Sequence, residues 1–267
     1  MKRIISLLLT AVMIVGALLV LAGCGEKFCP TCGCEPHGSD KCETCGCDGK
    51  SCPICGCEKH LPSVCEFCGC TKTFSDGCEF AATRSLEGRD VKYVKMTVKD
   101  YGNIILLLDA TTAPITVANF LKLTNKGFYN GLTFHRIMKG FMIQGGCPEG
   151  TGAGSTDPIV GEFYDNGYNN DLQHIRGVIS MARRGDSYDS GSCQFFICNA
   201  DARRSLDNQY AAFGYVLSGM SVVDTITDTC YPYANPYYNY TLTYKMLQPV
   251  IDEVVQISEK EALSYCN

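Results

Sequence analysis

Residues 134–146 read Phe-His-Arg-Ile-Met-Lys-Gly-Phe-Met-Ile-Gln-Gly-Gly. Arg136, Phe141 and Gln144 stand at spacings of five and three within this glycine-punctuated stretch. Taken singly, each residue has an ordinary structural interpretation: Phe141 as a core aromatic, Arg136 as a surface ion-pair partner and Gln144 as a polar residue at a strand end. Their combination in one short stretch favours a functional site over three unrelated structural roles.

Three further motifs follow along the chain: Gly-Val-Ile-Ser-Met-Ala at 177–182, Gln-Phe-Phe-Ile at 194–197, and Leu-Asp-Asn-Gln-Tyr-Ala-Ala-Phe-Gly at 206–214. In this order, the four motifs resemble those of the cyclophilin-type peptidyl-prolyl isomerases. The resemblance spans roughly residues 91–257. It implies a mainly β fold, a closed eight-stranded antiparallel β-barrel capped by two helices, with the active groove on its outer surface. Residues 91–258 are therefore predicted to form the isomerase domain, followed by a C-terminal tail at 259–267.

The chemistry that the resemblance implies is the rotation of an X-Pro amide, whose barrier of about 18–20 kcal/mol reflects the partial double bond between carbon and nitrogen. In the twisted transition state the prolyl nitrogen can accept a hydrogen bond, so a donor aimed at it binds the transition state selectively. The implied catalytic residues are Arg136 as that donor, Gln144 to hold the substrate carbonyl and steady Arg136, and Phe141. The implied substrate-binding residues are Met142, Ala182, Arg183, Gln194, Phe196, Leu206 and Tyr210, which stands where many members carry His. No catalytic cofactor is required.

Local patterns predict the elements of this domain. Alternating apolar and polar residues from Val94 to Val98 predict a half-buried strand, and turn residues at 100–103 lead into an apolar strand at 104–108. Pro114 opens a predicted helix that ends near Gly127, and a shorter helix is predicted at 220–226. Further strands are predicted at 177–181, 194–198, 212–217 and 250–257. The tyrosine-rich stretch 231–244 predicts a surface loop folded onto its own domain or, alternatively, a binding surface for polymers or proteins.

The N-terminus predicts export. Met1-Lys2-Arg3 precedes an almost unbroken apolar run from 4 to 22. Leu21-Ala22-Gly23-Cys24 resembles the lipobox of bacterial lipoproteins, which implies removal of residues 1–23 and lipidation of Cys24, with 24–28 as a short tether. The alternative is an uncleaved membrane helix, since the apolar run approaches the roughly 20 residues needed to cross a bilayer. Both interpretations place residues 25–267 outside the cytoplasm, on a bacterial membrane.

Residues 29–70 contain the unit Cys-x-x-Cys-Gly-Cys four times, and residues 71–90 read as a linker. Paired first with second and third with fourth, the units suit two four-thiolate zinc sites similar to small zinc ribbons. The predicted metal ligands are Cys29, Cys32, Cys42, Cys45, Cys52, Cys55, Cys65 and Cys68. A disulfide scaffold is the competing interpretation, because short exported segments that lack an apolar core are commonly cross-linked in this way.

Composition narrows the possible functions. The chain has 267 residues, of which 46% are hydrophobic and 19% charged, with a formal net charge of -5. These values exclude a disordered, collagenous or coiled-coil protein, and the negative charge argues against a nucleic-acid partner. We therefore predict a membrane-anchored isomerase that acts on X-Pro bonds of exported or surface proteins, with proline-containing polypeptides as partners. The alternative is a non-catalytic adaptor that binds proline segments in the groove and carries a metal-binding stalk.

Overall fold

The computed structural model describes residues 88–266. They belong to the second of the two units into which the chain divides, residues 71–267. The predicted export signal, the lipidated Cys24, the cysteine repeats with their eight metal ligands and most of the linker lie outside the described residues. Within residues 88–266, no helix is long and apolar enough to cross a membrane.

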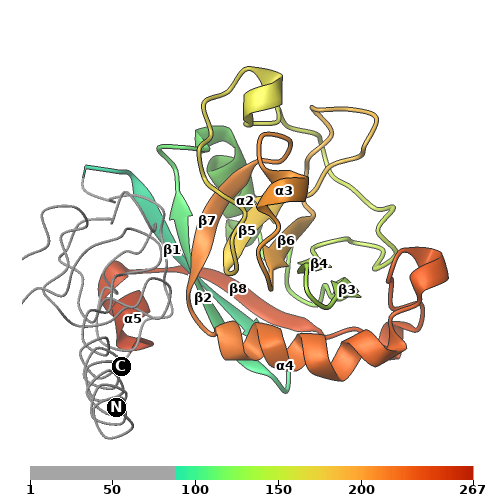
Figure 1. Ribbon diagram of the computed structural model, residues 1–267. Helices are drawn as coiled ribbons and strands as arrows, with labels where there is room; N and C mark the ends of the chain where they lie inside the picture. The colour runs from blue at the N-terminus through green and yellow to red at the C-terminus, as the bar shows by residue number, and fades with distance from the viewer. Residues whose placement is uncertain (1–87, 267) are drawn as a thin grey trace, which may run out of the picture. The chain divides into compact units, whose positions relative to one another are not determined.

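The domain is built on one antiparallel sheet of eight strands (Figure 1). Its order is β3-β4-β6-β5-β7-β2-β1-β8. The strands are β1 (Val91–Val98), β2 (Gly102–Asp109), β3 (Phe134–Met138), β4 (Met142–Gly145), β5 (Val178–Met181), β6 (Phe195–Cys198), β7 (Ala212–Ser218) and β8 (Ile251–Ile257). The predicted mainly β fold with eight antiparallel strands is confirmed.

The two edges of the curled sheet, β3 and β8, meet through short backbone contacts. The Phe134 amide donates to the Pro249 carbonyl at 2.9 Å, and the Ile251 amide donates to the Leu132 carbonyl at 2.7 Å. Pro249 has no N–H to return a hydrogen bond, so a regular ladder cannot extend across the seam. The closed barrel predicted from the sequence is therefore a curled sheet whose edges are joined just before each edge strand begins.

The strand β2 is apolar on both faces because both faces are covered. Ile104, Leu106 and Leu108 point into the main core, whereas Ile105 and Leu107 join a second cluster on the outer side. That second cluster includes Ala262, which the helix α5 (Glu259–Ser264) supplies. The segment 259–267, predicted to be a tail, thus contributes a helix to the folded domain.

Two longer helices, α2 (Pro114–Asn125) and α4 (Met220–Cys230), pack into the main core at different ends of the curled sheet (Figure 1). Pro114 occupies the first turn of α2, where its missing N–H leaves no helical bond unmade. The buried Glu162 carboxylate accepts from the Ile115 and Thr116 amides at 3.0 and 2.7 Å, which places negative charge at the positive end of α2. The helix α4 extends one turn beyond the predicted 220–226. Shorter elements are α3 (Arg203–Leu206) and the 3-10 turns η1 (Tyr164–Asn166), η2 (Tyr231–Tyr233), η3 (Pro236–Tyr238) and η4 (Lys245–Leu247).

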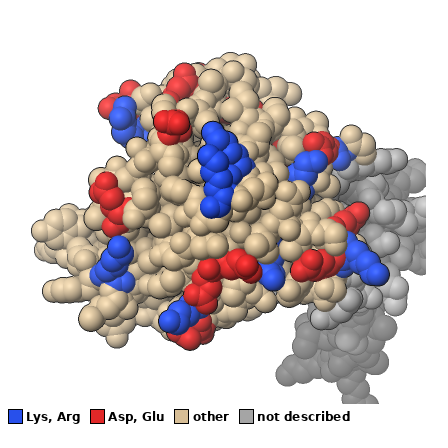
Figure 2. Space-filling view, turned by 180° about the vertical axis from the view of Figure 1, so that it is seen from behind, with Lys and Arg blue, Asp and Glu red and all other residues tan. Residues whose placement is uncertain are grey.

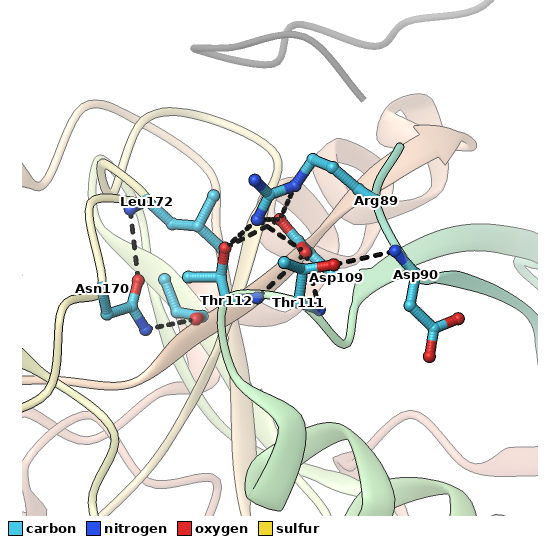
Figure 3. Close-up of polar contacts among 8 residues, drawn as sticks. Arg89, Asp90, Asp109, Thr111, Thr112, Asn170 and Leu172 are labelled. Atoms are coloured by element: carbon cyan, nitrogen blue, oxygen red, sulfur yellow. Dashed lines mark hydrogen bonds and ion pairs between the residues drawn. The ribbon is translucent and has the colours of Figure 1, made fainter. Parts of the chain in front are cut away.

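An ion pair between the partly buried Arg89 and the buried Asp109 fixes the start of the domain to the turn between β2 and α2 (Figure 3). The Arg89 guanidinium donates to both oxygens of Asp109, at 3.0 Å each, and to the Thr112 hydroxyl. Asp109 is fully buried, and its Oδ1 also accepts from the Thr111 and Thr112 amides at 3.1 Å. The burial of this carboxylate is offset because each of its oxygens accepts several hydrogen bonds.

Exposed charges on the domain are often paired with charges of opposite sign. Lys139 lies 2.7 Å from Asp228, and Arg176 lies 2.6 Å from Asp224. On the face seen in Figure 2, acidic and basic side chains lie near one another on a largely uncharged surface. Exposed pairs of this kind add little stability, typically about 0–1 kcal/mol each.

Candidate active site

The strand register brings the predicted site residues onto one face of the sheet. Arg136 on β3 stands opposite Gln144 on β4, and Gln144 stands opposite Phe196 on β6. Side chains alternate between the two faces of a strand. Ile137, Ile143 and Ile197, the chain neighbours of these residues, accordingly belong to the main core. The same alternation that fills the core therefore presents a cation, an amide and an aromatic ring side by side on the outer face.

These residues surround a cavity of about 150 Å³. It is far larger than the roughly 10–15 Å³ needed for one water, so it can take a side chain or ring of a ligand. Phe196, Met142 and Leu206 are 3%, 1% and 5% exposed and form a separate apolar cluster beneath the cavity. The lining residues are Arg136, Phe141, Met142, Gln144, Ala182, Arg183, Phe196, Leu206 and Tyr210.

A chain of hydrogen bonds connects the cavity to the loop beside it. Arg136 Nη1 donates to Gln144 Oε1 at 3.1 Å, and Gln144 Nε2 donates to Gln194 Oε1 at 2.9 Å. Gln194 Nε2 donates in turn to the carbonyls of Gly152 and Gly154 at 2.9 and 2.8 Å. Gln194 does not line the small cavity but lines a neighbouring one of about 550 Å³. The structure thus brings together all ten residues predicted for the groove; their roles in catalysis stay predictions.

Arg136 has partners beyond Gln144. Its Nε donates to the Asn239 carbonyl and its Nη2 to Asn239 Oδ1, each at 2.9 Å, and Nη2 also donates to Met138 Sδ at 3.1 Å. Partial burial lowers the pKa of the Arg136 guanidinium, and the nearby Tyr210 raises it slightly. Arginine starts from so high a pKa that the group stays a cation at neutral pH. Asn239 has no signal in the sequence that links it to Arg136, which is 103 residues away in the chain.

The aromatic wall of the cavity is supported from behind by a residue that the sequence did not identify. His174, 1% exposed, stacks on Phe196 with ring centroids 6.1 Å apart. Its Nδ1 lies 2.9 Å from Asp207 Oδ1 and its Nε2 lies 2.9 Å from Ser180 Oγ. Tyr210 meets the Phe196 ring edge-on at 5.8 Å. His174 therefore holds Phe196 in place from a position where it does not line the cavity itself.

Arg183 lines both cavities, as do Gln144 and Ala182. Its guanidinium lies over three aromatic rings, 4.7 Å from Tyr210, 5.1 Å from Tyr188 and 5.4 Å from Phe163, measured to the ring centroids. Its Nε donates to the Gln209 carbonyl at 2.9 Å. A guanidinium held in this way over aromatic faces is a rigid part of the wall.

The nine residues that line the small cavity include no Cys, Ser, His, Asp or Glu. An apolar ring fits against the floor, while the donors of Arg136 and Gln144 stand at the rim. This arrangement suits the recognition of a group without covalent attack on it. Within residues 88–266 there is also no cluster of three or more His, Cys, Asp or Glu side chains that would suit a metal ion.

Comparisons with known proteins point to the same family that the sequence motifs resemble. The sequence model of the family described as "Cyclophilin type peptidyl-prolyl cis-trans isomerase/CLD" matches residues 93–244. Relatives include peptidyl-prolyl cis-trans isomerase A of Dickeya dadantii, 42% identical over 165 residues that cover 60% of this chain and 80% of the relative. A peptidyl-prolyl cis-trans isomerase of Helicobacter pylori is 45% identical over 127 residues, covering 47% of this chain and 74% of the relative.

Solved structures show the same likeness. A cyclophilin type peptidyl-prolyl cis-trans isomerase of Cryptosporidium parvum superposes with a TM-score of 0.55 and 27% identity, covering 64% of this chain and 99% of that one. The same protein, crystallised in the presence of the dipeptide Ala-Pro, gives a TM-score of 0.53 at 26% identity, with 63% and 100% covered.

Proposed function

Since this chain belongs to the cyclophilin-type peptidyl-prolyl cis-trans isomerases, we propose that it isomerises X-Pro bonds of exported or surface proteins by hydrogen bonding from Arg136. The isomerase activity comes with membership of the family, and proline-containing peptides are its substrates. The residue roles are inferred from the geometry of the site, and the clients from the N-terminal sequence.

The placement of Arg136 at the rim of an apolar cavity is the observation that carries the proposed mechanism. The proline ring enters the cavity and contacts Phe196, Met142 and Leu206. As the amide twists, conjugation is lost and the prolyl nitrogen gains a lone pair that accepts from Arg136. The hydrogen bond forms only in the twisted state, so it lowers the barrier without tightening the binding of the planar substrate.

Gln144 serves both the enzyme and the substrate in this scheme. Its Oε1 accepts from Arg136, and one of its two amide hydrogens is donated to Gln194. A primary amide carries two N–H donors, so the second is available for the carbonyl of the residue before proline. The rest of the peptide extends past Ala182, Arg183 and Gln194 toward the neighbouring cavity.

The test of this function is the rate of cis/trans exchange in a short Ala-Pro-Phe peptide, measured by NMR with the full-length protein and with Arg136→Ala. We expect acceleration by the wild-type protein and a loss of roughly a hundredfold or more in the variant, as for removal of a transition-state donor. A variant that retains the full rate would leave the cavity as a binding site and remove Arg136 from the mechanism.

We further propose that Cys24 is the lipidated residue and that the clients are extracytoplasmic, on the strength of residues 21–24. A single acyl chain binds a membrane only weakly and reversibly. A cysteine that carries a diacylglyceryl group and a further acyl chain has three chains, which suffice for stable anchoring. Bacteria producing the wild-type chain should incorporate labelled palmitate into it and remove residues 1–23 from it, whereas Cys24→Ser should show neither change. Labelled Cys24→Ser protein would refute lipidation at this residue.

For residues 29–70 we propose two zinc sites of four cysteines each. The support is the C-x2-C-x9-C-x2-C spacing of both pairs of units, since two such knuckles close a tetrahedron of thiolates. Metal analysis of the full-length protein should find about two zinc ions per chain, lost on denaturation with a chelator. A metal-free protein whose repeat cysteines do not react with thiol reagents until reduced would instead establish the disulfide scaffold.

A further inference from the structure

The tyrosine-rich segment is fastened along the outer edge of β3, on both sides of Arg136. The Ile137 amide donates to the Tyr240 carbonyl at 3.1 Å, and the Leu242 amide donates to the His135 carbonyl at 2.8 Å. Arg136 itself pairs with Thr241 in an isolated bridge. Because β3 is an edge strand of the sheet, its outer backbone groups are available for this pairing. The segment therefore has a fixed position relative to the proposed catalytic arginine.

A turn in this segment aims Asn239 at the guanidinium. Asn239 and Tyr240 adopt φ angles of 54° and 59°, in the left-handed region. Asn tolerates that region, but a Tyr there is strained, and such strain persists only where the surroundings impose it. The Tyr240 amide donates to the Asn235 carbonyl at 2.8 Å, and the Tyr240 ring stacks on Tyr231 with centroids 6.0 Å apart. These contacts hold a turn that lets Asn239 reach Arg136 with both its carbonyl and its side chain.

The contact with Asn239 leaves one N–H group of the Arg136 guanidinium without an acceptor among the described residues. A guanidinium has five N–H groups in one plane. Asn239 accepts from Nε and from one Nη2 hydrogen, Met138 accepts from the other Nη2 hydrogen, and Gln144 accepts from one Nη1 hydrogen. Among the described residues, only the second Nη1 hydrogen has no acceptor. Since the group is planar, bonds at Nε and Nη2 also fix the direction of Nη1.

We propose that Asn239 is a positioning residue of the isomerase: it holds the Arg136 plane so that the one free Nη1 hydrogen is presented to the prolyl nitrogen. This inference rests on the proposed role of Arg136 as the donor. Asn239 does not line the small cavity, so it is not part of the surface against which the proline ring packs. Its loss should slow the twisted-state step while the affinity for a proline peptide stays the same.

The test compares four variants of the full-length protein, with kcat from NMR exchange and the Kd of an Ala-Pro peptide from titration. Asn239→Gly removes Oδ1 but keeps a residue suited to positive φ, and we expect kcat to fall about tenfold with Kd unchanged, as for loss of a hydrogen bond to a charged group. Asn239→Asp restores an acceptor and should stay within about threefold of wild type. Asn208→Gly is the matched control: Asn208 also has positive φ, at 68°, and its side chain has no hydrogen-bond partner among the described residues.

The outcomes separate this inference from the proposed function. A wild-type kcat in Asn239→Gly, equal losses in Asn239→Gly and Asn239→Asp, or a Kd that weakens as much as kcat falls would each overturn it. The fourth variant, Arg136→Ala, decides the mechanism itself: if it keeps its activity, the proposed role of Arg136 fails, whatever Asn239 does.

A measurement on the wild-type protein covers the case in which Asn239→Gly does not fold. A guanidinium held at Nε and Nη2 rotates slowly about its C–N bonds, so the nitrogen NMR spectrum should show separate Nη1 and Nη2 signals for Arg136. We expect one averaged Nη signal under the same conditions for Arg204, which is exposed and whose side chain has no hydrogen-bond partner among residues 88–266. An averaged Nη signal for Arg136 as well would overturn the inference.

Discussion

Acidification tests the buried environment of His135, the chain neighbour of Arg136. His135 is 1% exposed, and the loop at Gly152 packs against its ring, since a Cβ added there would lie 3.5 Å from Nε2. Burial, assisted by the positive charge of Arg136, lowers the pKa of His135 from 6.5 to about 4. Its burial favours a structural role for this histidine over direct contact with a ligand in the groove.

The sign and size of the effect follow from this shift. Between pH 6.5 and about 4 the unfolded chain binds a proton at this position that the folded chain does not bind, so the free energy of unfolding falls as the pH falls. The stability that neutral His135 contributes to the fold is fully present well above pH 6.5. At 1.36 kcal/mol for each unit of pKa, the loss between pH 7 and pH 4 is about 3 kcal/mol, a large share of the roughly 5–15 kcal/mol typical of a domain.

The perturbation is His135→Gln, which replaces the titrating ring by a neutral amide. Urea unfolding of both proteins, from pH 4 to 7.5, can be followed by circular dichroism because the chain has no Trp to report by fluorescence. Both proteins have the same carboxylates, so their contribution to the pH dependence cancels when the free energies of unfolding are subtracted at each pH. Between pH 7 and pH 4 we expect the free energy of unfolding of the wild type to fall by about 3 kcal/mol more than that of the variant. Two parallel curves would refute the reasoning, because they would mean that His135 is protonated equally in both states.

Three further outcomes follow from the site and the fold. Asp109→Ala should lower the free energy of unfolding by about 1–3 kcal/mol in urea titrations, because it removes the charged acceptor of the Arg89 hydrogen bonds while Arg89 itself keeps some access to water; an equal rate of isomerisation per folded molecule is the control. Leu206→Ala should raise KM about five- to tenfold with kcat nearly unchanged, since the apolar floor binds planar and twisted prolines alike; a selective fall in kcat would contradict this. The ratio kcat/KM should be flat from pH 6 to 8 in exchange measurements, as no His, Cys or carboxylate lines the cavity; a bell-shaped profile would require an acid or base that the site does not show.

The apolar socket was predictable because its residues lie in four short motifs whose order is specific. The strand residues Arg136, Gln144 and Phe196 alternate with core residues, and a period of two is visible in the sequence without knowledge of any partner strand. The first turn of α2 was predictable for a local reason too, because Pro114 fits only a few backbone conformations. The C-terminal end of α4 and the helix within residues 259–267 were harder to predict, since each depends on apolar contacts made with distant strands.

The sequence by itself determined which family the chain belongs to, and it predicted ten groove residues that the structure brings together. It also carries the export and cysteine motifs, which stay predictions. Only the tertiary structure decided that Asn239 accepts hydrogen bonds from Arg136, that His174 stacks on Phe196 and that α5 covers the outer face of β2. The physical reason is distance along the chain: turn chemistry and side-chain alternation are local, whereas a contact across 103 residues exists only after the sheet has curled and brought the last loop against its first edge strand.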